Sequence, residues 1–291
     1  MDELITSNTK IPSNFQCFFA PAKINLFLKI LSKRADGYHC LQSAFQLIDL
    51  YDEIHFKKRK DNKINTQYNV ESIKKENDLC LKAAELILKD FNVGVDIIVR
   101  KKIPIGGGLG GGSSDAATTL LALNELFNLN HEKNKLITFG LSLGADVPFF
   151  INGINAWVEG IGEKLSPISI DENEYLLFVP NIHISTKSIF KDFKLTKKSI
   201  PLKIATSIDD VAQDQMHNDL HVTILEKYPK LRELFNWLKE YGEPKITGTG
   251  STLFMKSNNV KDIKYIDKNK PKDIKIIRVR GLSVHPHLLT D

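Results

Sequence analysis

The residues best suited to chemistry in this 291-residue chain form a glycine-rich turn. Six of the seven residues at 106–112 are glycine, and Ser113 and Ser114 follow directly. Glycine lets backbone N–H groups approach an anion closely, and a helix after the turn adds unpaired N–H groups and the positive end of its dipole. A strand pattern precedes the turn and a largely apolar helix pattern follows it, a position that flexible linkers seldom occupy. The turn therefore predicts a phosphate-binding loop.

Two common phosphate-binding patterns do not account for this turn. A nucleotide P-loop requires a lysine directly before its hydroxyl residue, whereas Gly112 precedes Ser113 here. Three of the glycines match the dinucleotide pattern G-x-G-x-x-G, but a run of glycines matches this pattern easily, so the match has little specificity. A Rossmann fold also needs a second parallel strand that ends in an acidic residue, and the segment at 135–143 indicates a helix instead. A nicotinamide-dependent oxidoreductase is therefore disfavoured.

A lysine and an asparagine lie within a second strand pattern. Lys23 and Asn25 alternate with Ile24 and Leu26, which is the period of a strand. The alternation places Lys23 and Asn25 on one face, away from the apolar pair. A lysine at the start of an apolar strand either extends its ammonium group to solvent or serves a site. This segment alone leaves both interpretations open.

Two further polar segments lie in turns. Asp146 is flanked by apolar residues and followed closely by Pro148, so it either caps a helix or acts as a general base. A carboxylate beside a lysine stays ionised and can accept a hydroxyl proton. The second segment, 247–251, is a tight Gly- and Thr-rich turn that runs into a strand. Together with the glycine-rich turn it could close over a phosphate-bearing pocket.

The elements that must position these residues follow from the hydrophobic pattern. The helix at 115–127 is apolar almost all round, so we expect it to be buried, with Ser113 and Ser114 as its N-cap. A change of composition after Pro167 predicts two domains, at 1–167 and 168–291. The expected strands are 23–30, 93–99, 175–179, 251–255 and 274–279, and the expected helices are 77–91, 115–127, 135–143, 206–216, 219–227 and 231–241.

Composition sets limits on the class of protein. The 40 basic and 35 acidic residues give a net charge of +5, which suits an anionic substrate without requiring nucleic acid or a membrane. No run approaches the ~18 apolar residues of a membrane span, and no secretory signal is evident at the start. The three cysteines are far apart and form no C-x-x-C pair. They suit a reducing compartment, so we expect a cytoplasmic protein.

Three segments taken together resemble the motifs of the GHMP small-molecule kinase superfamily. They are Pro21-Ala22-Lys23-Ile24-Asn25, the glycine-rich turn with its two serines, and Gly248-Thr249-Gly250-Ser251. Further segments at 34–39, 41–43, 144–148 and 159–163 are similar to the 4-diphosphocytidyl-2-C-methyl-D-erythritol kinases within that superfamily. The resemblance implies an α+β GHMP kinase fold, with a ribosomal-protein-S5-like N-terminal domain and a ferredoxin-like C-terminal domain. The active site would lie in the cleft between them.

The resemblance also implies a reaction and its residues. ATP, with Mg²⁺, would phosphorylate the 2-hydroxyl of 4-diphosphocytidyl-2-C-methyl-D-erythritol in the non-mevalonate route to isoprenoid precursors, with Asp146 as base and Lys23 as the catalytic lysine. The ATP loop would comprise Pro104, Ile105, Gly106, Gly107, Gly108, Leu109, Gly110, Gly111, Gly112, Ser113 and Ser114. The substrate-binding residues would be Asn25, Tyr38, His39, Phe190 (stacked on the cytosine), Gly248, Thr249 and Gly250.

Some features stay unassigned, and rival classes make different predictions. The sequence identifies no Mg²⁺ ligand, and it fits a monomer or a homodimer. Thr247 stands where the resemblance leads us to expect serine, and the arm before Phe15 has no assigned role. A kinase for another alcohol is disfavoured by the segments at 37–39 and 144–148. An RNA-binding protein, which the S5-like fold would allow, is disfavoured by the even scatter of lysines.

Overall fold

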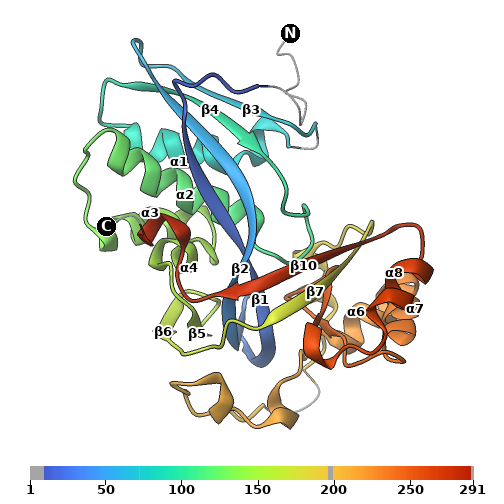
Figure 1. The fold of residues 1–291 in the computed structure, drawn as a ribbon. Coiled ribbons are helices and arrows are strands. Elements are labelled where there is room, and N and C mark those ends of the chain that lie inside the picture. Colours follow the sequence, from blue (N-terminus) through green and yellow to red (C-terminus); the bar gives the residue numbers. More distant parts are fainter. Residues whose placement is uncertain (1–9, 72, 196–198, 290–291) are drawn as a thin grey trace.

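The computed structural model describes residues 10–71, 73–195 and 199–289, in which helices pack on a continuous mixed sheet (Figure 1). The strands are β1 (Gln16–Lys33), β2 (His39–Arg59), β3 (Ile64–Tyr68), β4 (Gly94–Arg100), β5 (Ala156–Glu159), β6 (Lys164–Pro167), β7 (Glu174–Pro180), β8 (Lys245–Ile246), β9 (Leu253–Lys256) and β10 (Ile274–Leu282). The α-helices are α1 (Leu79–Leu88), α2 (Gly111–Leu126), α3 (Lys133–Leu143), α4 (Val147–Asn152), α5 (Thr186–Asp192), α6 (His221–Lys227), α7 (Pro229–Leu238) and α8 (Ile263–Asn269). Within the described ranges, no helix is long and apolar enough to cross a membrane.

Two groups of strands meet at the end of β10. In the first group β2 pairs with β1, β4 and β5, while β3 extends the sheet in parallel beside β4. In the second group the order is β10-β7-β9-β8, and all pairs are antiparallel. Gly281 and Leu282 of β10 also pair with β2, which joins the groups. The proposed domain boundary, after Pro167, falls at the end of β6 and before the connection to β7.

A register shift in β1 divides its side chains between two apolar cores. Up to Leu26 the predicted alternation holds, and Ile24 and Leu26 pack in the smaller core with Trp157 and Tyr175. The pairing with β2 then shifts between Asn25 and Leu28. Leu28 therefore belongs to the larger core, which contains residues of α1, α2, α4, α6 and α7. The shift lets one strand contribute side chains to both cores.

Most of the predicted elements are confirmed, with two corrections. The helix predicted from Asp115 begins earlier, at Gly111, because Gly110 adopts a left-handed conformation (φ 74°) and takes the N-cap position. The two serines therefore lie inside the helix and do not cap it. The predicted helix at 206–216 contains only 3-10 turns, at Ile208–Asp210 and Gln213–Gln215. Backbone hydrogen bonds between Ser169 and both Thr206 and Ile208 hold the start of this segment in an isolated β-bridge instead.

Replacing Phe149 by alanine tests the packing that fixes α4. The Phe149 ring is fully buried, 5.3 Å from the Phe45 ring and 5.1 Å from the Phe150 ring between centroids. We expect the cavity to lower the free energy of unfolding by about 3–5 kcal/mol in urea titrations. Leu141→Ala is the control, because Leu141 on α3 is exposed and should change it by less than about 0.5 kcal/mol. Equal losses in both variants would contradict this packing.

Candidate active site

A cavity of about 1240 Å³ brings together the residues that the sequence singled out. Strand β1, the glycine-rich turn, the turn before α4, the β1–β2 turn, α5 and the turn before β9 all contribute to its lining. Of the predicted site residues, Ser114 and Gly250 do not line it. Both are buried, and each directly follows a lining residue. The cavity therefore joins segments that are more than 200 residues apart, such as Lys23 and Gly248.

Lys23 and Asp146 form an ion pair at the centre of this lining. The Lys23 Nζ atom lies 3.5 Å from Asp146 Oδ2 and donates a hydrogen bond of 2.5 Å to Asn25 Oδ1. It also lies 4.2 Å from the centroid of the Phe45 ring. The Lys23 side chain is 5% exposed and that of Asp146 32%. The ammonium group is thus held in place from several sides, while the carboxylate faces the cavity.

Asp146 precedes α4 but does not serve it as a cap. It occupies the N-cap position, yet its side chain accepts no capping hydrogen bond, and its backbone is helical. The carboxylate instead faces Lys23, which comes from the distant strand β1. Capping, one of the two interpretations that the sequence left open, therefore does not explain this residue.

The glycine-rich turn follows the wall of the cavity with alternating left-handed residues. Gly106, Gly108 and Gly110 have φ angles of 71°, 75° and 74°. A Cβ atom on Gly108 would lie 2.4 Å from the Thr247 carbonyl oxygen, so no side chain fits there. The turn is bonded to its neighbours, because the Lys23 N–H donates to the Leu109 carbonyl at 2.9 Å. This hydrogen bond ties the turn to β1.

The turn at 247–250 is bonded to both of its neighbours. The Thr247 hydroxyl accepts from the Asn25 N–H at 3.0 Å and donates to the Gly108 carbonyl at 3.3 Å. Threonine therefore keeps the hydroxyl that the family pattern leads us to expect. No sequence pattern indicated Asn218, whose amide donates to the Ile246 and Gly248 carbonyls at 2.9 and 2.7 Å. That contact is visible only in the fold.

The far end of the cavity is lined by aromatic side chains. His39 is buried at the start of β2, and its ring centroid lies 5.4 Å from that of Phe190 on α5. Burial, and then the charge of Lys33, lower the pKa of His39, so the imidazole is neutral at neutral pH. A neutral imidazole offers one donor and one acceptor. Tyr38 is 60% exposed beside it.

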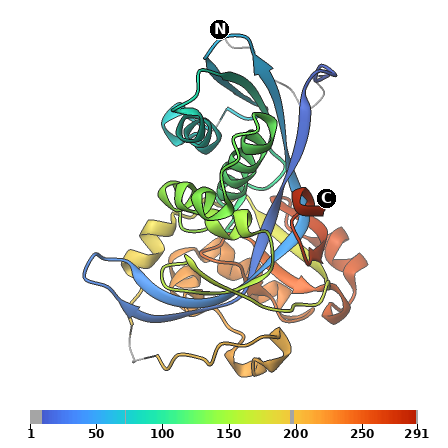
Figure 2. The same ribbon diagram turned by 90° about the vertical axis from the view of Figure 1, so that its left-hand side faces the viewer.

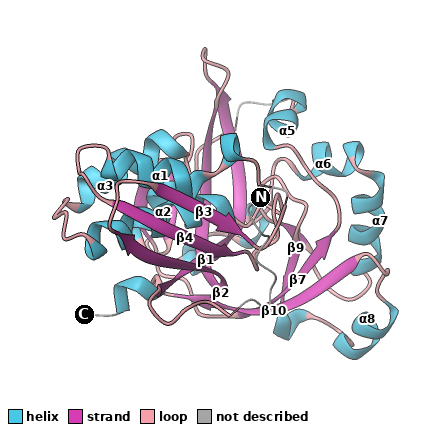
Figure 3. Ribbon diagram, turned by 90° about the horizontal axis from the view of Figure 1, so that it is seen from above, coloured by secondary structure: helices cyan, strands magenta, loops and turns pink. Residues whose placement is uncertain are grey.

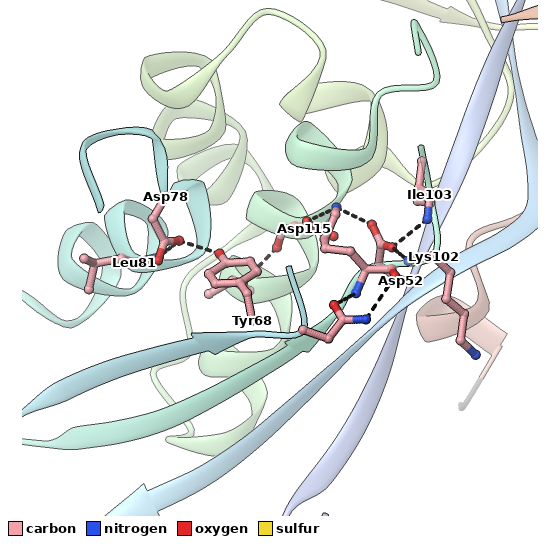
Figure 4. A network of polar contacts seen from close by, with 10 residues as sticks. Asp52, Tyr68, Asp78, Leu81, Lys102, Ile103 and Asp115 are labelled. Carbon is pink, nitrogen blue, oxygen red and sulfur yellow. Dashed lines mark hydrogen bonds and ion pairs between the residues drawn. The ribbon is translucent and has the colours of Figure 1, made fainter. Parts of the chain in front are cut away.

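A buried network behind the glycine-rich turn was not predicted from the sequence (Figure 4). The Lys101 ammonium group bonds both Asp52 and Asp115, the latter in the first turns of α2. Asp52 also accepts hydrogen bonds from the N–H groups of Lys102 and Ile103, at 2.5 and 2.8 Å. The network therefore ties β2, the end of β4 and α2 together directly under the turn.

Charge and burial have opposite effects on the pKa values of the groups in this network. Burial raises the pKa of Asp115, although Lys101 acts to lower it. Burial acts to lower the pKa of Lys101, but the two carboxylates outweigh it and raise that pKa. Two carboxylates thus share one ammonium group in a buried place, where an unpaired charge is costly.

A second group of polar contacts joins the start of α1 to β3 (Figure 4). Asp78 caps α1 by accepting from the Leu81 N–H at 2.9 Å. The hydroxyls of Tyr68 and Thr66 donate to its carboxylate, each at 2.6 Å. The largely apolar part of the lining next to this group consists of Tyr68, Ile73, Leu79, Cys80, Ile103 and Ile105. A flat apolar ring fits such a surface.

Comparison with known proteins defines the class first. Residues 78–153 match the family model described as the GHMP kinases N terminal domain, and this range contains the glycine-rich turn and Asp146. The crystal structure of the Methanococcus jannaschii mevalonate kinase is similar in fold, with a TM-score of 0.67 at 17% identity, over 94% of this chain and 100% of that one. The predicted α+β GHMP kinase fold is thereby confirmed.

Closer relatives define the family. A 4-diphosphocytidyl-2-C-methyl-D-erythritol kinase of Marinomonas sp. (strain MWYL1) is 41% identical over 270 residues, which are 92% of this chain and 87% of that protein. A crystal structure of 4-(cytidine 5'-diphospho)-2C-methyl-D-erythritol kinase has a TM-score of 0.77 at 26% identity, over 91% of this chain and 99% of that one. The chain therefore belongs to the family of 4-diphosphocytidyl-2-C-methyl-D-erythritol kinases, and it is an enzyme.

Replacing Asp115 by asparagine tests the raised pKa of this carboxyl. A carboxyl whose pKa is higher in the folded than in the unfolded protein contributes stability fully below about pH 4 and loses it as pH rises through the folded value. The asparagine side chain does not titrate. The free energy of unfolding of Asp115→Asn, relative to the unaltered protein, should therefore rise between about pH 4 and about pH 8 in urea titrations.

The control for this comparison is Asp90→Asn, because the side chain of Asp90 is 78% exposed. The free energy of unfolding of Asp90→Asn, relative to that of the unaltered protein, should stay almost constant over the same pH range. A constant difference for Asp115→Asn as well would contradict the raised pKa.

Proposed function

We propose that the enzyme transfers the γ-phosphoryl group of ATP to the 2-hydroxyl of 4-diphosphocytidyl-2-C-methyl-D-erythritol, in the non-mevalonate route to isoprenoid precursors. The observation that carries the proposal is the Lys23–Asp146 pair, which lies in one cavity with the glycine-rich turn and the His39–Phe190 pair. The names of the relatives support the choice of substrate. A cytoplasmic location, expected from the sequence, belongs to the same proposal.

ATP would bind with its phosphates on the glycine-rich turn and its adenine on the apolar lining beside α1. The turn presents backbone N–H groups next to the start of the 16-residue helix α2, whose dipole favours an anion. Leu79 and Ile103 offer flat apolar contact for the base. This placement leaves the opposite end of the cavity for the second substrate.

Mg²⁺ would enter together with ATP. In the described ranges no three acidic, histidine or cysteine side chains gather into a metal-binding group. Such an ion would take most of its ligands from phosphate oxygens and water, as Mg²⁺ often does with nucleotides. The hydroxyl of Ser113, which lines the cavity in the first turn of α2, fits as a protein ligand. When bound, the ion would neutralise phosphate charge.

In the reaction, Asp146 would accept the proton of the 2-hydroxyl group. The hydroxyl oxygen would then bond to the γ-phosphorus of ATP as the bond from that phosphorus to ADP breaks and ADP leaves. Lys23 would hold the carboxylate in place and stabilise the negative charge that develops on the oxygen. Asn25 fixes the ammonium group of Lys23 through the 2.5 Å hydrogen bond. Phosphoryl transfer depends mainly on such positioning and charge stabilisation.

The acceptor would lie along the other half of the cavity. Its cytosine would stack on Phe190 and form hydrogen bonds with the neutral His39, with Tyr38 closing over it from the β1–β2 turn. The erythritol part would then reach towards Gly248, Thr249 and Gly250 and towards Asn25. Gly250 would act through the shape of its turn, because it does not line the cavity.

An ADP-release assay with ATP and Mg²⁺ tests the proposed reaction. We expect turnover with 4-diphosphocytidyl-2-C-methyl-D-erythritol and none with mevalonate, homoserine or galactose. Selectivity follows because only the first has a cytosine for the His39–Phe190 pair. Turnover with one of the other alcohols would keep the kinase class but overturn the cytosine site.

Asp146→Asn tests the proposed base. A general base typically contributes about 10²–10⁴-fold, so kcat should fall by a factor in that range. Binding of a non-hydrolysable ATP analogue should stay within about twofold, because the phosphate loop is untouched. Asp210→Asn, at an exposed carboxylate outside the cavity, should leave both quantities unchanged. Near-normal kcat in Asp146→Asn would refute the assignment.

A further inference from the structure

Three lysines line the cavity around its aromatic end without a counter-ion. They are Lys33, Lys187 and Lys191, and all three side chains are exposed. Within the described part of the chain, none of their ammonium groups has a hydrogen-bond or ion-pair partner. The other two lysines of the lining are engaged, Lys23 with Asp146 and Lys101 with two carboxylates.

The fold places these lysines on two facing elements. Lys33 ends β1 and is the register partner of His39 on β2. Lys187 and Lys191 lie on α5 four residues apart, hence on one face of the helix, and Phe190 lies between them in sequence. Figures 2 and 3 show α5 beside the end of the β1–β2 hairpin, as the 5.4 Å contact between the His39 and Phe190 rings requires.

Nearby carboxylates are already occupied by other partners. Asp36, which lines the cavity, pairs with Arg34 at 2.7 Å and accepts from the Tyr38 N–H at 3.1 Å. Asp192 on α5 pairs with Lys227 of α6 and so points to the neighbouring helix. Like charges four residues apart on a helix repel, as do those of Lys187 and Lys191, and Lys33 adds a third positive charge on the facing element. An anion bound between the two walls would relieve this repulsion.

We propose that Lys33, Lys187 and Lys191 bind the diphosphate group of the acceptor substrate. The inference rests on the proposed function, because it takes the cytosine to lie at His39 and Phe190. A diphosphate attached to that nucleoside lies within reach of both walls, and long lysine side chains can follow it. The phosphates of ATP have their own site on the glycine-rich turn. The lysines thus distinguish a nucleoside diphosphate ester from a neutral alcohol.

Calorimetric binding of cytidine and of cytidine diphosphate tests this directly. The test variant carries Lys33→Gln, Lys187→Gln and Lys191→Gln. The control carries Lys264→Gln, Lys268→Gln and Lys272→Gln, which make the same charge change at exposed positions outside the cavity. Both variants keep the aromatic pair and the Lys23–Asp146 pair. Far-ultraviolet circular dichroism and thermal unfolding show whether each variant is folded.

We expect the test variant to bind cytidine diphosphate at least about tenfold more weakly, since charge-assisted hydrogen bonds to phosphate are among the strong ones. Its affinity for cytidine and its KM for ATP should stay unchanged. The affinity for cytidine diphosphate should also depend less steeply on salt than in the control.

Other results would overturn the proposal. Unchanged affinity for cytidine diphosphate would show that the lysines do not hold the diphosphate, and an equal loss for cytidine would show that they shape the base site instead. A raised KM for ATP, with no change in the binding of cytidine diphosphate, would show that the lysines bind ATP instead of the acceptor. Failure of the proposed function has a different readout, namely no turnover of the cytidyl substrate by the unaltered enzyme. That result can occur even if cytidine diphosphate binds through these lysines.

Discussion

Three backbone segments meet beside Lys23, with no space for a side chain at Gly108, and the geometry of the site depends on this contact. A Cβ on Gly108 would lie 2.4 Å from the Thr247 carbonyl, and the Thr247 hydroxyl bridges Asn25 and Gly108. Because the turn lies this close, its N–H groups and the Lys23–Asp146 pair face one space. Glycine at Gly108 is therefore a packing requirement, apart from any part that the turn plays in the proposed binding of phosphate.

A buried network of charged side chains lies next to this close contact. Lys101 holds Asp52 and Asp115 together under the first turn of α2. A buried network of this kind is costly to desolvate, so it adds little net stability compared with apolar packing. It does restrict the directions in which α2 and the strand ends can move. The site thus rests on polar contacts below and on the phenylalanines of α4 beside it.

Local features could be predicted well from the sequence, and distant contacts poorly. The run of glycines predicted the sharp turn before α2, and strand alternation predicted the shared face of Lys23 and Asn25, because these depend on neighbouring residues. The contacts of Asn218 and Lys101 depend on tertiary packing, so no local pattern indicated them. The segment at 206–216 was wrongly predicted as a helix, because hydrogen bonds to Ser169 at its start override its propensity and leave only 3-10 turns.

The most direct test of the account is a crystal structure with a non-hydrolysable ATP analogue and 4-diphosphocytidyl-2-C-methyl-D-erythritol bound together. The account predicts the 2-hydroxyl oxygen within about 2.6–3.2 Å of an Asp146 carboxylate oxygen and in line with the γ-phosphorus. It also predicts the γ-phosphate on the glycine-rich turn and the cytosine against Phe190. A 2-hydroxyl directed away from Asp146, or adenine in place of cytosine at Phe190, would contradict it.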